Sequence, residues 1–374
     1  MRILMLNYEF PPLGGGAANA TRQILEEFAG STDLQIDLVT SSVTDARIDP
    51  FADNIAVHYV DIGKGKNLHY QTMGELLRYY RRASSYAKKL CKDEKFDLCH
   101  AFFGIPCGYM ARGLGMPYIV SLRGSDVPFY NPRFKILDAF LFASMSRRIW
   151  EEAKFVVANS TGLRELALAT SPTQKIGVIP NGVDTDMFMP VENESQELRV
   201  ICVSRLIKRK GVDTLIRAVA EMHDQPIRLM IVGTGNEEEN LKRPVSILGI
   251  EGKVEFKGYV PHDELPALYQ ANDVFVLPSL NEGMSNTVLE AMACGLPTVL
   301  TDTGGSAELL RDGGNGFLIR KKSVGDIVEK LGIYLNDRDL VRKHGAESRK
   351  IAEQMSWGNV ALAYVELYKK ANNM

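Results

Sequence analysis

The chain has 374 residues, of which 45% are hydrophobic and 24% charged, and its formal net charge is −2. This composition is typical of a globular protein with about two ordinary domains. The charge argues against nucleic acid as a partner, because nucleic-acid-binding domains are usually strongly basic. The five cysteines, at 91, 99, 107, 202 and 294, show no paired spacing. We therefore expect reduced thiols in a cytoplasmic protein, with no disulfide and no metal cluster.

The N-terminal apolar run within MRILMLNYEFPP is too short for a signal peptide. The sequence also has no stretch of about 20 apolar residues, so we expect no segment that spans a membrane.

Short apolar runs alternate with amphipathic segments along the whole chain. We expect strands over 2–7, 35–40, 117–122, 155–160 and 175–180, and then over 198–204, 228–233, 253–258, 274–279 and 297–302. Because the runs are continuously apolar, they indicate parallel sheets covered on both faces, and their helix-length spacers indicate βαβ units. The expected fold class is α/β, with two doubly wound Rossmann-like domains facing each other across a cleft.

The polar stretch 181–198 is expected to be a linker between these domains. The predicted domains are 1–183 and 184–356. A terminal helix over about 357–374 is expected to pack back on the first domain, because Val360, Tyr364, Leu367 and Tyr368 share one helical face.

Two glycine-rich segments follow predicted strands. Gly14, Gly15 and Gly16 lie between the first strand and the first helix, where glycines let a backbone approach a ligand and leave N–H groups at a helix N-terminus. The segment 232–239 contains Gly233 and Gly235 in a similar place, and a tight structural turn explains that pair equally well. Neither segment has the third glycine of a dinucleotide fingerprint, which argues against a Rossmann dehydrogenase.

Four cations occur within 205–210, after the first strand of the second domain. Lys208 and Arg209 are expected to be solvated. Arg205 and Lys210 are expected at the carboxyl end of the strand, where ligands of open α/β sheets bind. An arginine fork and a lysine point charge are the usual counterions of phosphate, so this pair predicts a diphosphate site.

The segment EGMSNTVLEAMACGLPTV, residues 282–299, places one glutamate in a loop and a second in the following helix. The helix is expected to begin near Ser285, and the backbone N–H groups of 284–287 would then favour a phosphate. Glu290 can accept hydrogen bonds from a ribose diol, and Glu282 can reach sugar hydroxyls or support charge at a reacting carbon. A helix with an N-terminal charge and one ordinary surface glutamate is the alternative.

A metal-dependent route has little support in the sequence. Asp184 and Asp186 spell Asp-x-Asp, but they lie in the expected linker and not after a strand. The six histidines are dispersed, and His100 is expected to be a satisfied histidine of the core or cleft.

These motifs together resemble glycosyltransferase family 4, the retaining enzymes of the GT-B fold. The resemblance covers essentially the whole chain and rests on PPLGGGAANAT, SLRGSDV, ANS, IPNGVD, VSRLIKRKG, VGTG, GYV and, above all, EGMSNTVLEAMACGLPTV. It implies an acceptor-side first domain and a second domain that binds the nucleotide-sugar donor.

The resemblance also implies roles for individual residues. Arg205 and Lys210 would hold the donor diphosphate and stabilise the leaving group, Glu290 would bind ribose, and Glu282 would contact the donor sugar. The remaining residues implied in donor binding are Gly15, Gly16, Gly233, Tyr259, Val260, Gly283, Met284, Ser285, Asn286 and Thr287. Many family members have histidine where this chain has Arg123. We expect Arg123 in the site, either binding an anionic group or pairing with Asp126, and Asp126 is a weaker candidate for acceptor contact.

The implied reaction transfers a hexose or N-acetylhexosamine, with retention and without a metal or other cofactor, from a nucleoside-diphosphate sugar to an acceptor saccharide or lipid-linked saccharide. The frequency of donors in the family favours a UDP-linked sugar. The product would be a cell-surface polysaccharide, lipopolysaccharide or glycolipid. No protein nucleophile is expected, because phosphate oxygen can take the proton of the attacking hydroxyl. A sugar-nucleotide epimerase of the same fold and a non-catalytic nucleotide-sugar-binding protein are the alternatives.

Residues 76–92 predict an amphipathic helix with Leu77, Tyr80, Ala83, Ala87 and Leu90 on one face and basic residues around it. Such a helix can lie on an anionic membrane, which would place the protein at the inner face of the cell membrane. An ordinary helix with solvated lysines explains the pattern equally well.

Overall fold

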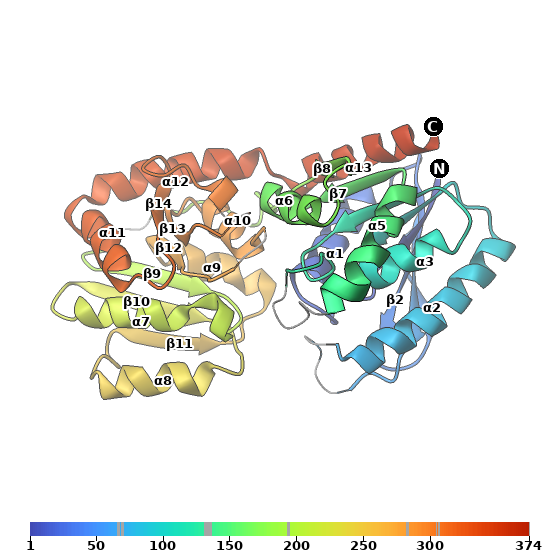
Figure 1. Ribbon diagram of the computed structural model, residues 1–374. Helices are drawn as coiled ribbons and strands as arrows, with labels where there is room; N and C mark the ends of the chain where they lie inside the picture. The colour runs from blue at the N-terminus through green and yellow to red at the C-terminus, as the bar shows by residue number, and fades with distance from the viewer. Residues whose placement is uncertain are drawn as a thin grey trace. The chain divides into compact units, whose positions relative to one another are not determined.

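The computed structural model describes residues 1–65, 68, 71–130, 137–192, 195–281, 284–303, 305 and 307–373. Contacts divide the chain into two compact units (Figure 1). The first unit comprises Met1–Asn181 and Trp357–Met374, and the second comprises Gly182–Ser356. Each unit contains one mainly or wholly parallel sheet flanked by helices, so the prediction of two doubly wound Rossmann-like sheets is confirmed.

The sheet of the first unit has the strand order β3-β4-β2-β1-β5-β6-β7-β8. Its strands are β1 (Arg2–Leu6), β2 (Gln35–Ser42), β3 (Arg47–Ala52), β4 (Ile55–Asp61), β5 (Leu98–Phe102), β6 (Tyr118–Leu122), β7 (Phe155–Ala158) and β8 (Ile176–Val178). All neighbours pair in parallel except β3, which is antiparallel to β4 at the edge. The chain runs outward from β1 through β2 to the edge strand β3, turns back into β4 and returns to β5 beside β1. From β5 it runs outward in the opposite direction. This reversal is the topological switch point of a doubly wound fold.

The α-helices of the first unit include α1 (Gly16–Phe28), α2 (Met73–Asp93), α3 (Tyr109–Arg112), α5 (Ala143–Glu152) and α6 (Thr161–Thr170), which lie between its strands in sequence, and the C-terminal α13 (Trp357–Asn372). Figure 1 shows α2, α3 and α5 on the viewer's side of the sheet. Helix α13 buries Val360, Tyr364 and Tyr368 in the core of this unit, while Leu367 is partly buried.

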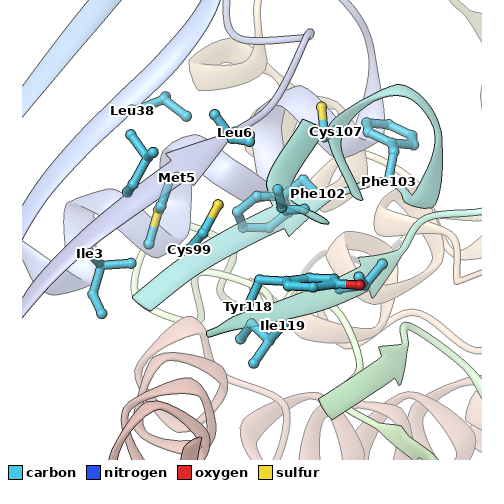
Figure 2. Close-up of a cluster of buried hydrophobic side chains, with 14 of the residues drawn as sticks. Ile3, Met5, Leu6, Leu38, Cys99, Phe102, Phe103, Cys107, Tyr118 and Ile119 are labelled. Atoms are coloured by element: carbon cyan, nitrogen blue, oxygen red, sulfur yellow. The ribbon is translucent and has the colours of Figure 1, made fainter. Parts of the chain in front are cut away.

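Figure 2 shows part of this core, in which buried side chains of β1, β2, β5 and β6 pack together. Cys99 and Cys107 lie in this cluster. Burial raises the pKa of both thiols. Because the thiolate is the reactive form, these cysteines act as small apolar core residues, and all five cysteines of the chain are free thiols.

The second sheet has the strand order β11-β10-β9-β12-β13-β14, and every neighbouring pair is parallel. Its strands are β9 (Leu198–Val203), β10 (Ile227–Val232), β11 (Val254–Gly258), β12 (Val274–Leu277), β13 (Thr298–Thr301) and β14 (Gly316–Ile319). Its α-helices include α7 (Val212–Glu221), α8 (Glu238–Ile247), α9 (Leu265–Gln270), α10 (Asn286–Ala293), α11 (Val324–Asn336) and α12 (Arg338–Glu353). The topological switch point lies between β9 and β12.

The expectation that 181–198 is a linker is wrong for residues 182–188. Val183 and Phe188 are 2% and 1% exposed and belong to the core of the second unit. Arg349 of α12 donates hydrogen bonds to the carbonyls of Thr185 and Phe188. The sequence of this segment is mostly polar, but two of its apolar residues, Val183 and Phe188, pack in the core and hold the backbone against the second unit.

The apolar face predicted for the basic helix is also only partly right. In α2 the buried residues are Glu75, Tyr79, Ala83 and Ala87, which are spaced four apart. Leu77 is 57% exposed to solvent. Tyr79 determines this orientation, because its hydroxyl donates to the carbonyl of Val39 and its ring fills the core. Among the described residues, no helix is both long and apolar enough to cross a membrane.

Candidate functional site

Four adjacent strands deliver most of the predicted donor-site residues to one edge of the second sheet. The loop after β9 carries Arg205 and Lys210, the loop after β10 begins with Gly233, and Tyr259 follows β11. Helix α10, with Glu290, follows β12. Because β11, β10, β9 and β12 are neighbours in that order and all parallel, their carboxyl ends share one edge. This is the edge at which ligands of open α/β sheets bind.

The two predicted phosphate-binding cations differ in their surroundings. Arg205 is exposed to solvent, whereas Lys210 is only 7% exposed and ends a short 3-10 turn, Lys208–Lys210. The next residue, Gly211, has φ = +66°, and a Cβ atom there would lie 2.3 Å from the carbonyl oxygen of Pro278. Glycine is therefore required where the β9 loop meets the β12 loop. The amide of Leu280 donates to the carbonyl of Arg209 and joins the same two loops.

Helix α10 begins where the sequence predicts, with Ser285 as its N-cap. The Ser285 side chain makes no capping hydrogen bond to the backbone; its hydroxyl lies 3.1 Å from that of Thr287. Met284 and Ser285 are buried, and Asn286 and Thr287 are partly exposed. The first turn thus combines backbone N–H groups, two hydroxyls and the positive end of the helix dipole, which suits an anion.

Glu290 is 6% exposed and is held by two side chains that the sequence analysis did not identify. The Tyr269 hydroxyl donates to Glu290 Oε2 at 2.9 Å, and His262 Nε2 lies 3.2 Å from Glu290 Oε1. The hydrogen bond to Glu290 raises the pKa of His262, and burial opposes this effect. Tyr269 stays protonated, because burial raises its pKa far above the ordinary value. The sequence offered one signal for His262: it lies two residues after Val260, which was itself predicted to line the donor site.

Gly233 has a structural role. It has φ = +125°, and a Cβ atom there would lie 2.0 Å from the carbonyl oxygen of Ser204. Gly235 meets the carbonyl of Leu206 at 2.1 Å in the same way. These glycines press the β10 loop against the segment that carries Arg205. Tyr259 is 69% exposed beside this edge, and Val260 packs partly against the core.

Two predicted residues, Glu282 and Gly283, lie outside the described residues. Four others belong to the first unit. Gly15 is the N-cap of α1, Gly16 is its first residue, and a Cβ atom on Gly15 would meet no atom within 4 Å. The N-terminus of α1 therefore has an open approach to its backbone.

Arg123 lies after β6 and does not pair through its side chain with Asp126. Its guanidinium donates to Asn181 Oδ1 at 2.9 Å and to the Tyr364 hydroxyl at 3.2 Å, and it lies 5.0 Å from the centre of the Phe102 ring. Arg123 thereby connects the loop after β6 to Asn181 and to Tyr364 of α13.

Asp126 is 8% exposed and serves the backbone of its own loop. Its carboxylate accepts N–H groups from Gly104, Arg123 and Gly124 at 2.7–2.9 Å. These bonds fix the turn after β6, and they explain why the carboxylate is not available to the Arg123 side chain.

His100 is a satisfied core histidine, as expected. It is fully buried and lies 2.7 Å from the hydroxyls of both Tyr368 and Ser121. Burial lowers its pKa well below the ordinary value, so it is neutral.

Asp184 of the Asp-x-Asp sequence caps a turn. Its Oδ1 accepts the backbone N–H groups of Asp186 and Met187 at 3.0 and 2.9 Å. Within the described ranges, no group of three or more histidine, cysteine, aspartate or glutamate side chains is placed to hold a metal ion.

Two family models match the chain. Residues 14–187 match the family described as Glycosyltransferase Family 4, and residues 184–351 match Glycosyl transferases group 1. One similar curated protein is the D-inositol 3-phosphate glycosyltransferase of Corynebacterium jeikeium, which is 36% identical over 313 residues, covering 75% of this chain and 74% of the relative.

Solved structures share the fold over nearly the whole chain. Sucrose-phosphate synthase from Thermosynechococcus elongatus superposes with a TM-score of 0.86 at 22% identity, covering 99% of this chain and 98% of the other. The Anabaena protein HepE, solved in complex with UDP-glucose, gives a TM-score of 0.74 at 22% identity and covers 99% of both chains.

Proposed function

Given that the chain belongs to glycosyltransferase family 4, we propose that it transfers a hexose or N-acetylhexosamine from a nucleoside-diphosphate sugar to an acceptor hydroxyl, with retention of configuration. One observation carries this proposal: Lys210, the N-terminus of α10 and Glu290 converge on the switch-point edge of the second sheet. They are the groups that a diphosphate and a ribose need, and they follow the neighbouring strands β9 and β12.

The donor diphosphate would lie between the β9 loop and the first turn of α10. Lys210 would approach the phosphates from a buried position, where its charge is screened less by water. Arg205, which is exposed, would close over the ligand from the solvent side. The backbone N–H groups at the start of α10 would complete the site. Preorganised donors of this kind contribute about 3–4 kcal/mol each to transition-state stabilisation.

We propose a UDP-linked donor. The UDP-glucose complex of HepE, which has the same fold, supports this choice. Tyr259 and Val260, after β11, would lie beside the base, and Glu290 would receive the 2′- and 3′-hydroxyls of the ribose. Glu282, with Gly283 and Met284, would contact the sugar itself.

In the proposed mechanism, the bond between the sugar C1 and the diphosphate oxygen breaks first, and negative charge develops on that oxygen. Arg205, Lys210 and the α10 amides stabilise this charge. The acceptor hydroxyl attacks C1 from the face that the diphosphate leaves, and a phosphate oxygen takes its proton. Configuration is therefore retained without a protein nucleophile, a metal or a further cofactor.

The acceptor side is proposed to be the first unit, through Gly15, Gly16 and the loop after β6. We propose a saccharide or lipid-linked saccharide acceptor in the synthesis of a surface polysaccharide, lipopolysaccharide or glycolipid. Family membership favours transfer over the epimerase and over a non-catalytic binding protein.

The test is donor turnover. The protein is incubated in the presence of chelator with UDP-glucose, UDP-N-acetylglucosamine and GDP-mannose, and with a panel of saccharide acceptors, and nucleotide release is measured. We expect release of UDP that acceptor accelerates, with an α-linked product by NMR. A β-linked product from an α-linked donor would exclude retention, and epimerised nucleotide sugar formed without acceptor would favour the epimerase.

A further inference from the structure

The carboxylate of Glu290 has two side-chain hydrogen-bond partners, of which one stays protonated and the other can change its charge near neutral pH. The partner that stays protonated is Tyr269 of α9, whose side chain is fully buried and donates to Oε2. The other is His262, in the short turn His262–Glu264 before α9, whose side chain keeps 45% of its exposed area. One side of the carboxylate is thus held by the core, and the other by an imidazole in contact with solvent.

Three carboxylates raise the pKa of His262. They belong to Glu290 on α10, which also accepts its hydrogen bond, to Asp184 in the segment before β9, and to Asp263 beside His262 in sequence. Phe188, from the same segment as Asp184, presents its ring at 63° to the imidazole with a centroid distance of 5.2 Å. The imidazole thus packs against Phe188 and lies near three carboxylates, and its hydrogen bond to Glu290 keeps it protonated to a higher pH than an ordinary histidine.

Glu290 retains the capacity to bind a ligand while it holds both partners. A carboxylate has about four acceptor positions on its two oxygens. Tyr269 and His262 use one position on each oxygen, which leaves one on each for the two hydroxyls of a ribose. Their hydrogen bonds also fix the plane of the carboxylate, so that ordering it adds little entropic cost when the ligand binds.

We propose that His262 is a positioning residue of the nucleotide site, whose imidazolium holds Glu290 for the ribose and offsets the negative charge of the diphosphate. The affinity for the donor should then fall as pH rises through and beyond neutrality. This inference rests on the proposed function, because it takes Glu290 to be the ribose ligand.

The sign follows from the charges. Below the pKa of His262 the imidazolium balances one of the three carboxylates, and a dianionic ligand binds to a less negative site. Above that pKa the imidazole still offers a hydrogen bond through Nε2 but no charge. The expected change is therefore a weakening and not a loss of binding. A change of one pKa unit in His262 between the free and bound states corresponds to about a tenfold change in affinity.

The experiment is calorimetric titration with UDP-glucose and GDP-mannose from pH 5.5 to 8.5 at constant ionic strength. Neither diphosphate diester has a phosphate group that titrates in this range. For the wild type we expect the Kd of the bound donor to be about three- to tenfold higher at pH 8.5 than at pH 6. His262→Gln, which keeps an N–H donor without the charge, should give a flat profile. His223→Gln is the matched control: His223 also neighbours an aspartate in this unit but is 61% exposed, and this variant should keep the wild-type slope.

A second readout separates positioning from mere folding. The ring C–H signals of His262, followed by NMR against pH, should show a raised pKa that falls toward the ordinary value in Glu290→Gln and rises further when donor binds. Equal pH slopes in wild type and His262→Gln, or an unchanged His262 pKa in Glu290→Gln, would overturn the inference alone. Failure of the wild type to bind either nucleotide sugar, or UDP, GDP or ADP, would overturn the proposed function as well.

Discussion

The carboxyl edges of the two sheets are occupied in different ways. On the second sheet, the loops bring together a buried lysine, an exposed arginine and a helix N-terminus whose N-cap side chain leaves the backbone uncapped. On the first sheet, polar side chains of β5 and of the loop after β6 make most of their hydrogen bonds within the unit. Asp126 holds three backbone amides, Arg123 binds Asn181 and Tyr364, and His100 is enclosed by Tyr368 and Ser121.

This difference indicates where ligand chemistry is concentrated. The first turn of α10 has no side-chain cap, so its backbone N–H groups can gain hydrogen bonds from an anion, whereas a network of satisfied hydrogen bonds gains little from a ligand. We therefore propose that the second unit carries the groups that bind the nucleotide. The first unit is proposed to provide the acceptor side.

The largest expected effect tests the cation of the second unit. Lys210→Ala should reduce kcat by about 100-fold or more, because a preorganised charge at the leaving group is lost. Lys208→Ala is the control, since that lysine belongs to the same turn but is exposed. The quantity to measure is UDP release under saturating donor. Equal loss in both variants would assign the effect to the general charge of the loop.

The next effect concerns affinity. Glu290→Ala should raise the Kd for UDP about 10- to 100-fold, because hydrogen bonds to a charged acceptor contribute about 1.5–3 kcal/mol. Glu239→Ala, at a side chain that is 91% exposed, should leave the Kd unchanged. Titration calorimetry measures both. An unchanged Kd in Glu290→Ala would separate this residue from the ribose.

A third effect concerns the packing that places Arg205. Gly233→Ala should destabilise the second unit by about 1–3 kcal/mol or more, because its Cβ would collide with the Ser204 carbonyl at a φ that disfavours side chains. Gly252→Ala, where a Cβ meets nothing within 4 Å, is the matched control. Thermal unfolding of both variants measures the difference. A stable Gly233→Ala protein that loses nucleotide binding would point to direct ligand contact instead.

On the first unit, Asp126→Asn should destabilise the fold by about 1–3 kcal/mol, because asparagine keeps one acceptor oxygen but its NH2 cannot accept the backbone N–H groups that face the other carboxylate oxygen. We expect its effect on donor affinity to be small. Asp53→Asn, at an exposed position in the same unit, should be neutral in denaturant unfolding. A stable Asp126→Asn protein with a raised KM for acceptor only would restore Asp126 as an acceptor ligand.

The smallest expected effect concerns the basic surface of α2 on the first unit. We propose that the exposed lysines of α2 give weak binding to anionic vesicles, assisted by the exposed Leu77. Changing Lys88, Lys89 and Lys92 to glutamate should abolish flotation at low salt, whereas Lys321→Glu with Lys322→Glu should not. If the wild type does not float with anionic vesicles, the membrane proposal ends.

The sequence predicts the second unit better than the first. Its strands β9 to β13 are short apolar runs, and the start of α10 follows from Ser285 preceding a helical pattern. In the first unit β3, β4 and β5 were missed. The strand β3 contains Pro50 and charged residues at an exposed edge, β4 mixes buried and partly exposed residues, and β5 is a short run that includes His100. The edge strand β14 was missed in the second unit. The sequence also did not predict the hydrogen-bond partners of Glu290. Tyr269 and His262 approach it only because α9 and α10 pack together, and local sequence does not encode that contact.

The most direct test of the central claim is calorimetric titration of the protein, with chelator present, against UDP, GDP, ADP and NADH. The account predicts tight binding of one nucleoside diphosphate, UDP by our proposal, which is weakened about tenfold or more in both Lys210→Ala and Glu290→Ala. Preference for NADH, or binding to none of the diphosphates, would mean that the edge between β9 and β12 does not receive a nucleotide diphosphate, and would contradict the account.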